Sequence, residues 1–206
     1  MGSTKIKICG IKSRNDIQVI NEVLPDYIGF MFAKSSRMIT EETAGILRAY
    51  LHPLVTTVGV FVNEEIDKII RLCSLKIIDI IQLHGDEGAD YIKKLKKELP
   101  NRIIKAVRVK GMQDIQRAGV INCDYLLLDS FKDNMYGGSG TSFDWSVIRE
   151  VGKPYFLAGG INQSNVLQAI NEYHPYCVDV SSGVETDGRK DGDKIRKLVS
   201  MIRSVS

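Results

Sequence analysis

The chain has 206 residues, of which 44% are hydrophobic and 26% are charged, and its formal net charge is +3. These values predict a soluble globular protein with one sizeable core, in one or at most two domains. They exclude an extended basic surface for nucleic acid, and no apolar run approaches the roughly 20 residues that cross a bilayer.

The segment 1–4 is too short and too polar for a secretory signal, and we expect a disordered or tag-like N-terminus there. The four cysteines form no Cys-x-x-Cys pair. We therefore expect neither a zinc site nor a disulfide framework, and the predicted location is a reducing cytoplasm.

From residue 5 onward, short apolar runs alternate with amphipathic stretches. The apolar runs cover residues 5–9, 27–32, 57–62, 77–83, 103–109, 125–129, 154–158 and 177–180. The amphipathic stretches cover residues 15–23, 41–51, 63–72, 91–99, 112–118, 145–151, 164–173 and 191–202. Nearly continuous apolarity is typical of parallel strands covered on both faces, and the amphipathic pattern between them predicts helices.

Eight strand–helix alternations predict an α/β fold, a single-domain (β/α)₈ TIM barrel over residues 5–206, which lies at the lower size limit of that fold. The alternative is a doubly wound sheet, which usually has fewer units at this length. It would also carry a Gly-x-Gly-x-x-Gly turn after the first strand, and the segment Cys9-Gly10-Ile11-Lys12 does not match that turn.

Catalytic groups of a TIM barrel lie at the carboxyl ends of its strands, which directs attention to Cys9 and Asp129. A thiol at the end of the first strand can be tuned to remove a carbon-bound proton, although a lone cysteine is commonly a small buried hydrophobe. Asp129 follows three leucines, and such an apolar setting can keep a carboxyl protonated as an acid. The alternative is a carboxylate that caps a loop. Strands one and six would place the two groups across the barrel mouth.

Glycine and serine end the seventh and eighth strands and predict a phosphate site. Glycine lets backbone N–H groups approach an anion, and a short helix near Ser182 would direct its positive end toward that anion. The alternative is that the glycines only form tight turns. The residues concerned are Gly159, Gly160, Ser181, Ser182 and Gly183.

Three further features suggest how a ligand is held, and Arg37 suggests that it has a second anionic end. Arg37, after the second strand, could hold a carboxylate by its planar guanidinium, or form only a surface ion pair. His84 could orient the ligand, although a lone histidine is more often structural. The loop 130–142 contains Gly138 and Gly140 and suits a lid over the substrate, with a merely flexible loop as the alternative.

Several motifs together resemble those of the phosphoribosylanthranilate isomerase family of tryptophan biosynthesis, from about residue 5 to the end of the chain. They are Lys7-Ile8-Cys9-Gly10-Ile11, Gln82-Leu83-His84-Gly85, Leu128-Asp129-Ser130, residues 137–145, Leu157-Ala158-Gly159-Gly160-Ile161 and residues 179–185. Serine at position 139 and isoleucine at position 161 depart from the family pattern without touching a charged group.

The resemblance implies a cofactor-free and metal-free Amadori rearrangement. The substrate would be N-(5-phosphoribosyl)anthranilate and the product 1-(2-carboxyphenylamino)-1-deoxyribulose 5-phosphate. Carried over by motif, Cys9 would be the general base, Asp129 the general acid, and Arg37 the group that binds the anthranilate carboxylate. The chain would act on this small phosphorylated molecule as a monomer or a homodimer.

Two other functions fit a phosphate-binding barrel. A sugar-phosphate epimerase that needs a metal would require histidine and aspartate ligands at several strand ends, and His84 is the only histidine at one of them; a lyase is a related possibility. A non-catalytic phospho-ligand-binding barrel is the third alternative, because fold alone does not fix function. It would not need Cys9 and Asp129 together.

Overall fold

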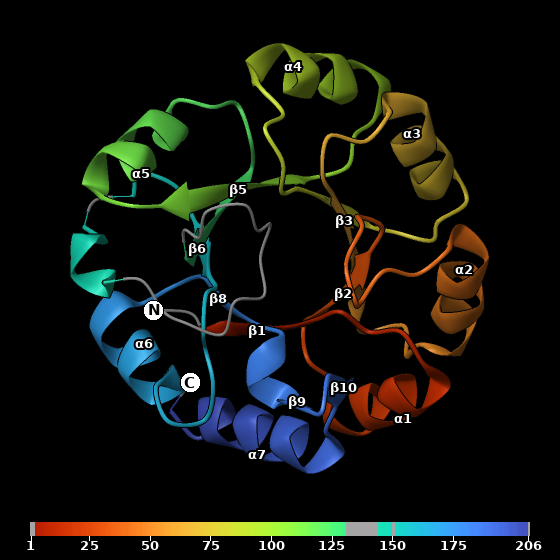
Figure 1. The fold of residues 1–206 in the computed structure, drawn as a ribbon, viewed down its shortest axis with the longest axis vertical. Coiled ribbons are helices and arrows are strands. Elements are labelled where there is room, and N and C mark those ends of the chain that lie inside the picture. Colours follow the sequence, from red (N-terminus) through yellow and green to blue (C-terminus); the bar gives the residue numbers. More distant parts are fainter. Residues whose placement is uncertain (1–2, 131–143, 150, 206) are drawn as a thin grey trace.

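The predicted apolar runs form a closed barrel of eight parallel strands in the computed structural model, which describes residues 3–130, 144–149 and 151–205. Each strand pairs with the next along the chain, and the first pairs with the eighth (Figure 1). The strands are β1 (Lys5–Cys9), β2 (Tyr27–Met31), β3 (Thr56–Phe61), β4 (Ile80–Leu83), β5 (Ile103–Val109), β6 (Tyr125–Ser130), β7 (Tyr155–Leu157) and β8 (Cys177–Val180).

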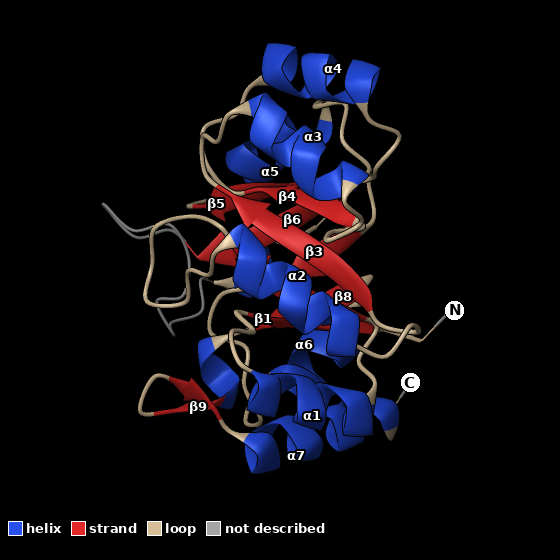
Figure 2. Cartoon of the chain, turned by 90° about the vertical axis from the view of Figure 1, so that its right-hand side faces the viewer, coloured by secondary structure: helices blue, strands red, loops and turns tan. Residues whose placement is uncertain are grey.

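Helices surround the barrel as an outer ring (Figures 1 and 2). They are α1 (Arg14–Val23), α2 (Glu41–Tyr50), α3 (Ile66–Ser74), α4 (Ala89–Glu98), α5 (Met112–Gly119), α6 (Val166–Tyr173) and α7 (Gly192–Arg203), with 3₁₀ turns η1 (Trp145–Val147) and η2 (Ser182–Val184). Side-chain caps fix several starts: Ser13 and Asp16 form a capping box on α1, and Thr40 and Asp191 cap α2 and α7. None of the helices within the described residues is long and apolar enough to span a membrane.

The helix predicted over residues 145–151 is wrong beyond its first turn. The structure has only the three-residue η1, which Asp144 caps by accepting a hydrogen bond from the Ser146 N–H. Ile148 leaves the helical path after one 3₁₀ hydrogen bond to Trp145. Gly152 then takes a left-handed φ of 68°, and Pro154 follows before β7.

Two other predicted boundaries differ because side chains replace the regular pattern. Residues 77–79 precede β4 rather than forming part of it, and Asp79 accepts hydrogen bonds from the backbone N–H and the hydroxyl of Thr57. Asn63 does not begin α3, because its φ of 50° is left-handed and its N–H donates to Glu87. The helix therefore begins at Ile66.

The hydrophobic core has two layers separated by the strand ring. The larger lies between the strands and the helices, and the smaller fills the amino-terminal part of the barrel interior. The interior layer consists of Tyr27, Val58, Ile80, Ile104, Ala106, Tyr125, Leu127, Phe156, Ala158 and Cys177. Side chains two residues further along the same strands share this inward direction, so the alternation of a strand carries Gln82, Asp129 and Asp179 toward the carboxyl-terminal mouth.

A short β-hairpin follows β8 along the chain and forms a separate two-stranded sheet. It consists of β9 (Glu185–Thr186) and β10 (Arg189–Lys190), and Figure 2 shows β9 beyond the strand ring. The sequence analysis did not predict this hairpin. It brings Glu185 and Lys190 back toward the end of β1, where Arg37 also lies.

Candidate active site

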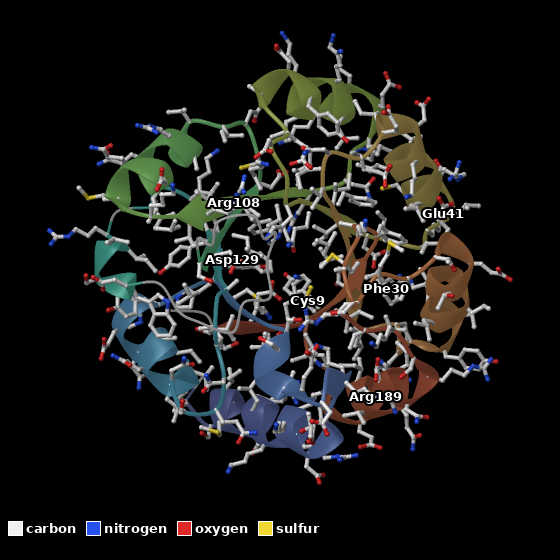
Figure 3. All side chains as sticks on the ribbon, in the orientation of Figure 1. Cys9, Phe30, Glu41, Arg108, Asp129 and Arg189 are labelled. Atoms are coloured by element: carbon white, nitrogen blue, oxygen red, sulfur yellow. The ribbon has the colours of Figure 1, made fainter. Side chains whose placement is uncertain are left out.

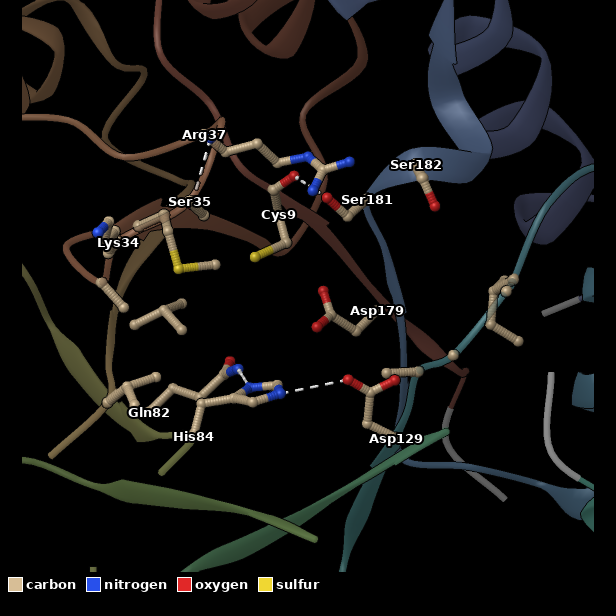
Figure 4. Close-up of a pocket in the computed structure, with 18 residues that line it drawn as sticks. Cys9, Lys34, Ser35, Arg37, Gln82, His84, Asp129, Asp179, Ser181 and Ser182 are labelled. Carbon is tan, nitrogen blue, oxygen red and sulfur yellow. Dashed lines mark hydrogen bonds and ion pairs between the residues drawn. The ribbon is translucent and has the colours of Figure 1, made fainter. Parts of the chain in front are cut away.

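A cavity of about 400 Å³ opens at the carboxyl ends of the strands. Figure 3 places Cys9 and Asp129 near the centre of the ring and Glu41 at its outside, and Figure 4 shows the polar side chains that enclose the cavity. Among the described residues its walls are formed by Cys9, Met31, Ala33, Lys34, Ser35, Arg37, Val60, Val62, Gln82, His84, Asp129, Ala158, Gly159, Gly160, Ile161, Asp179, Ser181 and Ser182.

Cys9 ends β1, and its side chain is 5% exposed. Gly29 on β2 stands opposite Cys9, and a Cβ at Gly29 would lie 2.6 Å from Cys9 Sγ. The missing side chain of Gly29 therefore creates the space that the sulfur occupies. Burial raises the pKa of the Cys9 thiol, while the positive charges of Lys7 and Lys190 act in the opposite direction.

Asp129 is a buried carboxyl on β6 that is held from two sides. Oδ1 accepts a hydrogen bond from the Ser130 N–H at 2.8 Å, and Oδ2 lies 3.2 Å from Nε2 of His84. The imidazole of His84 therefore covers one side of the carboxyl, while Asp129 still lines the cavity. This combination of fixed orientation and access to a ligand is what a general acid requires.

Beneath the cavity, a fully buried ammonium joins two polar side chains. Lys7 Nζ donates to Gln82 Oε1 and to Asp179 Oδ2, each at 2.9 Å. Burial is the largest single effect and would lower the pKa of Lys7, but the charges of Asp179 and Cys9 and the hydrogen bond to Asp179 together outweigh it, and the pKa is raised. Gln82 in turn contacts His84 Nδ1 at 2.8 Å. The other oxygen of Asp179, Oδ1, is buried and finds no hydrogen-bond partner among the described residues.

Arg37 is part of an ion-pair cluster at the rim. Its Nε and Nη2 donate to the two oxygens of Glu185, each at 2.7 Å, and Lys190 also donates to Glu185 at 2.7 Å. Burial alone would raise the pKa of Glu185, but these hydrogen bonds outweigh it and lower the pKa to about 2. Glu185 thus fixes the plane of the guanidinium. None of the described residues accepts a hydrogen bond from Nη1 of Arg37.

The ends of β7 and β8 bring small residues together. Gly159 and Gly160 both have left-handed φ angles, of 78° and 73°, and both line the cavity. Ser181 and Ser182 line it as well, and η2 begins at Ser182 as the sequence predicted. Backbone N–H groups at such a turn form a concave site for an anion.

The structure brings most of the predicted site residues to one cavity. Eight of them line it: Cys9, Arg37, His84, Asp129, Gly159, Gly160, Ser181 and Ser182. Gly183 is not among the described residues of the wall. A Cβ there would lie 2.0 Å from the Ile161 carbonyl oxygen, so this glycine permits two strand-end segments to pack closely. Gly138 and Gly140 lie outside the described residues.

Sequence reasoning assigned no role to five residues of this region. They are Lys7, Gln82, Asp179, Glu185 and Lys190. The first three carry a signal that a strand period of two reveals: Lys7 lies two residues before Cys9, Gln82 two before His84, and Asp179 two before Ser181. Glu185 and Lys190 depend on the unpredicted hairpin. Within the described residues, no group of three or more His, Cys, Asp or Glu is placed to hold a metal ion.

Comparison with known proteins gives a family match over nearly the whole chain. The family model for N-(5'-phosphoribosyl)anthranilate (PRA) isomerase matches residues 6–201. The chain belongs to this family. The N-(5'-phosphoribosyl)anthranilate isomerase of Endomicrobium trichonymphae is 46% identical over 201 residues, which cover 98% of this chain and 99% of that protein.

Solved PRA isomerase structures have the same fold. Phosphoribosyl anthranilate isomerase from Thermotoga maritima has a TM-score of 0.88 at 37% identity, covering 98% of this chain and 99% of its own. A second structure, of a phosphoribosyl anthranilate isomerase in complex with reduced 1-(o-carboxyphenylamino)-1-deoxyribulose 5-phosphate, has a TM-score of 0.85 at 37% identity with the same coverage. The family resemblance and the TIM barrel predicted from the sequence are therefore confirmed.

Proposed function

We propose that the chain catalyses the Amadori rearrangement of N-(5-phosphoribosyl)anthranilate to 1-(2-carboxyphenylamino)-1-deoxyribulose 5-phosphate in tryptophan biosynthesis. The observation that carries the proposal is a single cavity in which a thiol, a carboxyl, an arginine and two glycine- and serine-rich strand ends converge. Membership of the PRA isomerase family supports the same reaction.

The two anionic ends of the substrate bind on opposite sides of the cavity. The phosphate lies against the backbone of Gly159 and Gly160 and the serines that follow β8, where N–H groups can donate to its oxygens. The anthranilate carboxylate binds Arg37 through Nη1, the nitrogen that Glu185 leaves available. Holding both ends places the sugar between Cys9 and Asp129.

The reaction then needs one proton donated and one removed. Asp129 gives its proton to the ring oxygen of the furanose, the bond between C1 and that oxygen breaks, and the nitrogen lone pair forms a Schiff base with C1. The thiolate of Cys9 removes the proton from C2, and the electron pair of that bond moves toward the cationic nitrogen to give an enolamine. Tautomerisation yields the ketone. The substrate nitrogen itself accepts the electrons.

Asp179 provides an acceptor for the sugar. Asp179 lines the cavity, its Oδ2 is held by Lys7, and its buried Oδ1 has no partner among the described residues. A buried carboxylate oxygen without a donor is costly, and a ribose hydroxyl supplies that donor when substrate binds. Asp179 is thus assigned to substrate binding rather than to proton transfer.

We place the reaction in the cytoplasm, as the sequence analysis predicted. All four cysteines, Cys9, Cys73, Cys123 and Cys177, are free thiols in the structure. Free thiols are typical of a reducing compartment, where a thiol base is also protected from oxidation.

The test is the loss of anthranilate-type fluorescence when the protein meets freshly prepared phosphoribosylanthranilate. We expect turnover by the wild-type chain, and a loss of at least about 10²-fold in kcat for Cys9→Ala and for Asp129→Ala, because each removes one proton-transfer group. Circular dichroism should show that both variants fold.

Two variants outside the cavity are the matched controls. Cys73→Ala removes a thiol from α3, and Asp90→Ala removes an exposed carboxylate from α4. Both should keep near-normal turnover. Near-normal turnover of Cys9→Ala or Asp129→Ala would instead refute the assigned roles. A wild-type chain that binds the reduced product analogue without turnover would be a non-catalytic barrel.

A further inference from the structure

A continuous chain of hydrogen bonds connects Lys7, beneath the cavity, with Asp129 in its wall. Lys7 Nζ to Gln82 Oε1 spans 2.9 Å, Gln82 Nε2 to His84 Nδ1 spans 2.8 Å, and His84 Nε2 to Asp129 Oδ2 spans 3.2 Å. Figure 4 shows the last two links as dashed lines. Three strands contribute, since Lys7 lies on β1, Gln82 on β4 and Asp129 on β6.

The ammonium fixes the direction of the first link. An ammonium has three donors and no acceptor, so the atom of Gln82 that faces Lys7 must be the carbonyl oxygen. The amide nitrogen of Gln82 therefore faces His84. A reversed amide would place two donors against each other in a buried site, because Lys7 is 0% and Gln82 1% exposed.

The amide in turn fixes the protonation of the ring. The amide nitrogen of Gln82 only donates, so Nδ1 of His84 must present its lone pair to it. A histidine with a bare Nδ1 carries its hydrogen on Nε2, and this hydrogen points at Asp129 Oδ2. The ring is then neutral and has no free lone pair on either nitrogen.

From this geometry we infer that Lys7 and Gln82 are positioning residues that set the tautomer of His84, so that His84 donates to Asp129 and cannot take its proton. The carboxyl proton of Asp129 is left on an oxygen lone pair that faces neither His84 nor the Ser130 N–H, and Asp129 lines the cavity. The proton is thereby reserved for the substrate. This inference deepens the proposed function and rests on it for its catalytic meaning.

The direct test is the tautomer, which can be measured without substrate. Long-range ¹H–¹⁵N correlation spectra of uniformly ¹⁵N-labelled protein at neutral pH distinguish a protonated from an unprotonated ring nitrogen. We expect Nε2 of His84 to be protonated and Nδ1 unprotonated. His174, exposed at the end of α6, and His52 serve as internal references because neither belongs to the hydrogen-bond chain that ends at Asp129. A protonated Nδ1 of His84 in the wild-type chain would overturn the inference.

Two substitutions of Gln82 test whether its amide sets the tautomer of His84. Gln82→Glu replaces the donor with a carboxylate that only accepts, so Nδ1 of His84 should become protonated. Gln82→Met removes both polar groups and should give a mixture of tautomers. The signals of His174 should not move in either variant. Both variants retain Lys7, whose removal could prevent folding by leaving Asp179 as an unpaired buried charge.

We expect kcat to change with the tautomer of His84. kcat should fall at least tenfold in Gln82→Glu and by a smaller factor in Gln82→Met, because an inverted ring can compete for the Asp129 proton. An inverted tautomer with unchanged kcat would overturn the positioning role while leaving the isomerase activity intact. A wild-type chain with the expected tautomer and no isomerase activity would contradict the proposed function instead.

Discussion

In the proposed reaction, Cys9 acts as a base in a place where burial disfavours its charged form. The thiol is 5% exposed, and burial raises its pKa, while Lys7 and Lys190 oppose that effect. A thiolate that is costly to form is also a strong base once formed, which suits the removal of a weakly acidic carbon-bound proton. The two buried ammonium groups thus bear on the proposed proton removal, although neither is assigned to donate or accept a proton.

Glu185 gives a residue-scale prediction for stability against pH. Its folded pKa of about 2 lies below its ordinary value of 4.5, so the unfolded chain binds the proton more readily. The pair with Arg37 and Lys190 therefore stabilises the fold above about pH 4.5, and this contribution is lost as the pH falls toward 2. A depression of that size corresponds to about 3 kcal/mol at most.

The measurement compares urea unfolding of the wild-type chain and Glu185→Gln between pH 7 and pH 2. At neutral pH the variant should be less stable, because Arg37 and Lys190 lose their partner. The difference in unfolding free energy should narrow below pH 4.5, as protonation removes the same charge from the wild-type chain. A difference that stays constant down to pH 2 would contradict the assignment of the low pKa to Glu185.

At the scale of elements, the pairing of β1 with β2 determines where the sulfur lies. Gly29 stands opposite Cys9, and Gly29→Ala would place a methyl group 2.6 Å from Sγ, so one of the two must move. We expect a loss of about 1–3 kcal/mol in stability from overpacking, and a loss of about 10²-fold in kcat from a displacement near 1 Å.

Gly45→Ala is the matched control for that variant. Gly45 lies inside α2, and a Cβ there makes only ordinary contact, 3.7 Å from Ile77. Alanine should preserve turnover and raise stability slightly, since glycine is unfavourable within a helix. Wild-type turnover in Gly29→Ala would show that the sulfur position is not set by this pair of strands.

Much of the element order could be predicted from apolar runs alone, because strands buried on both faces have a nearly continuous pattern. The failures are local. At residues 145–151 the chain leaves the helical path after η1, and at Asn63 a left-handed backbone delays α3. Neither departure is visible in hydrophobic periodicity.

The candidate site residues that could be predicted are reactive side chains at or just after the end of a strand, as for Cys9, His84 and Asp129. Lys7 and Gln82 were missed because they lie within apolar runs, where a polar residue is hidden by its neighbours. Alternation with Cys9 and His84 would have shown that both point into the barrel. Glu185 and Lys190 could not be placed, since their position depends on a hairpin of two-residue strands.

At the scale of the whole molecule, closure of the barrel is what assembles the site. β1 and β6 are separated along the ring by β7 and β8, so residues 120 positions apart in sequence line the same cavity. The intervening strand ends supply the proposed phosphate site, and Arg37 comes from the far side of β1. The interior below holds Lys7 with its two polar partners and, beneath them, apolar side chains, which keeps the proposed reacting groups at one mouth.

The most direct measurement is a crystal structure of this chain with reduced 1-(o-carboxyphenylamino)-1-deoxyribulose 5-phosphate bound. We expect the phosphate at Gly159, Gly160 and the serines after β8, the carboxylate at Arg37, and C2 of the sugar next to Cys9 Sγ with Asp129 on the opposite side. A ligand bound in the reverse direction, or with C2 out of reach of Cys9, would contradict the proposed proton transfers.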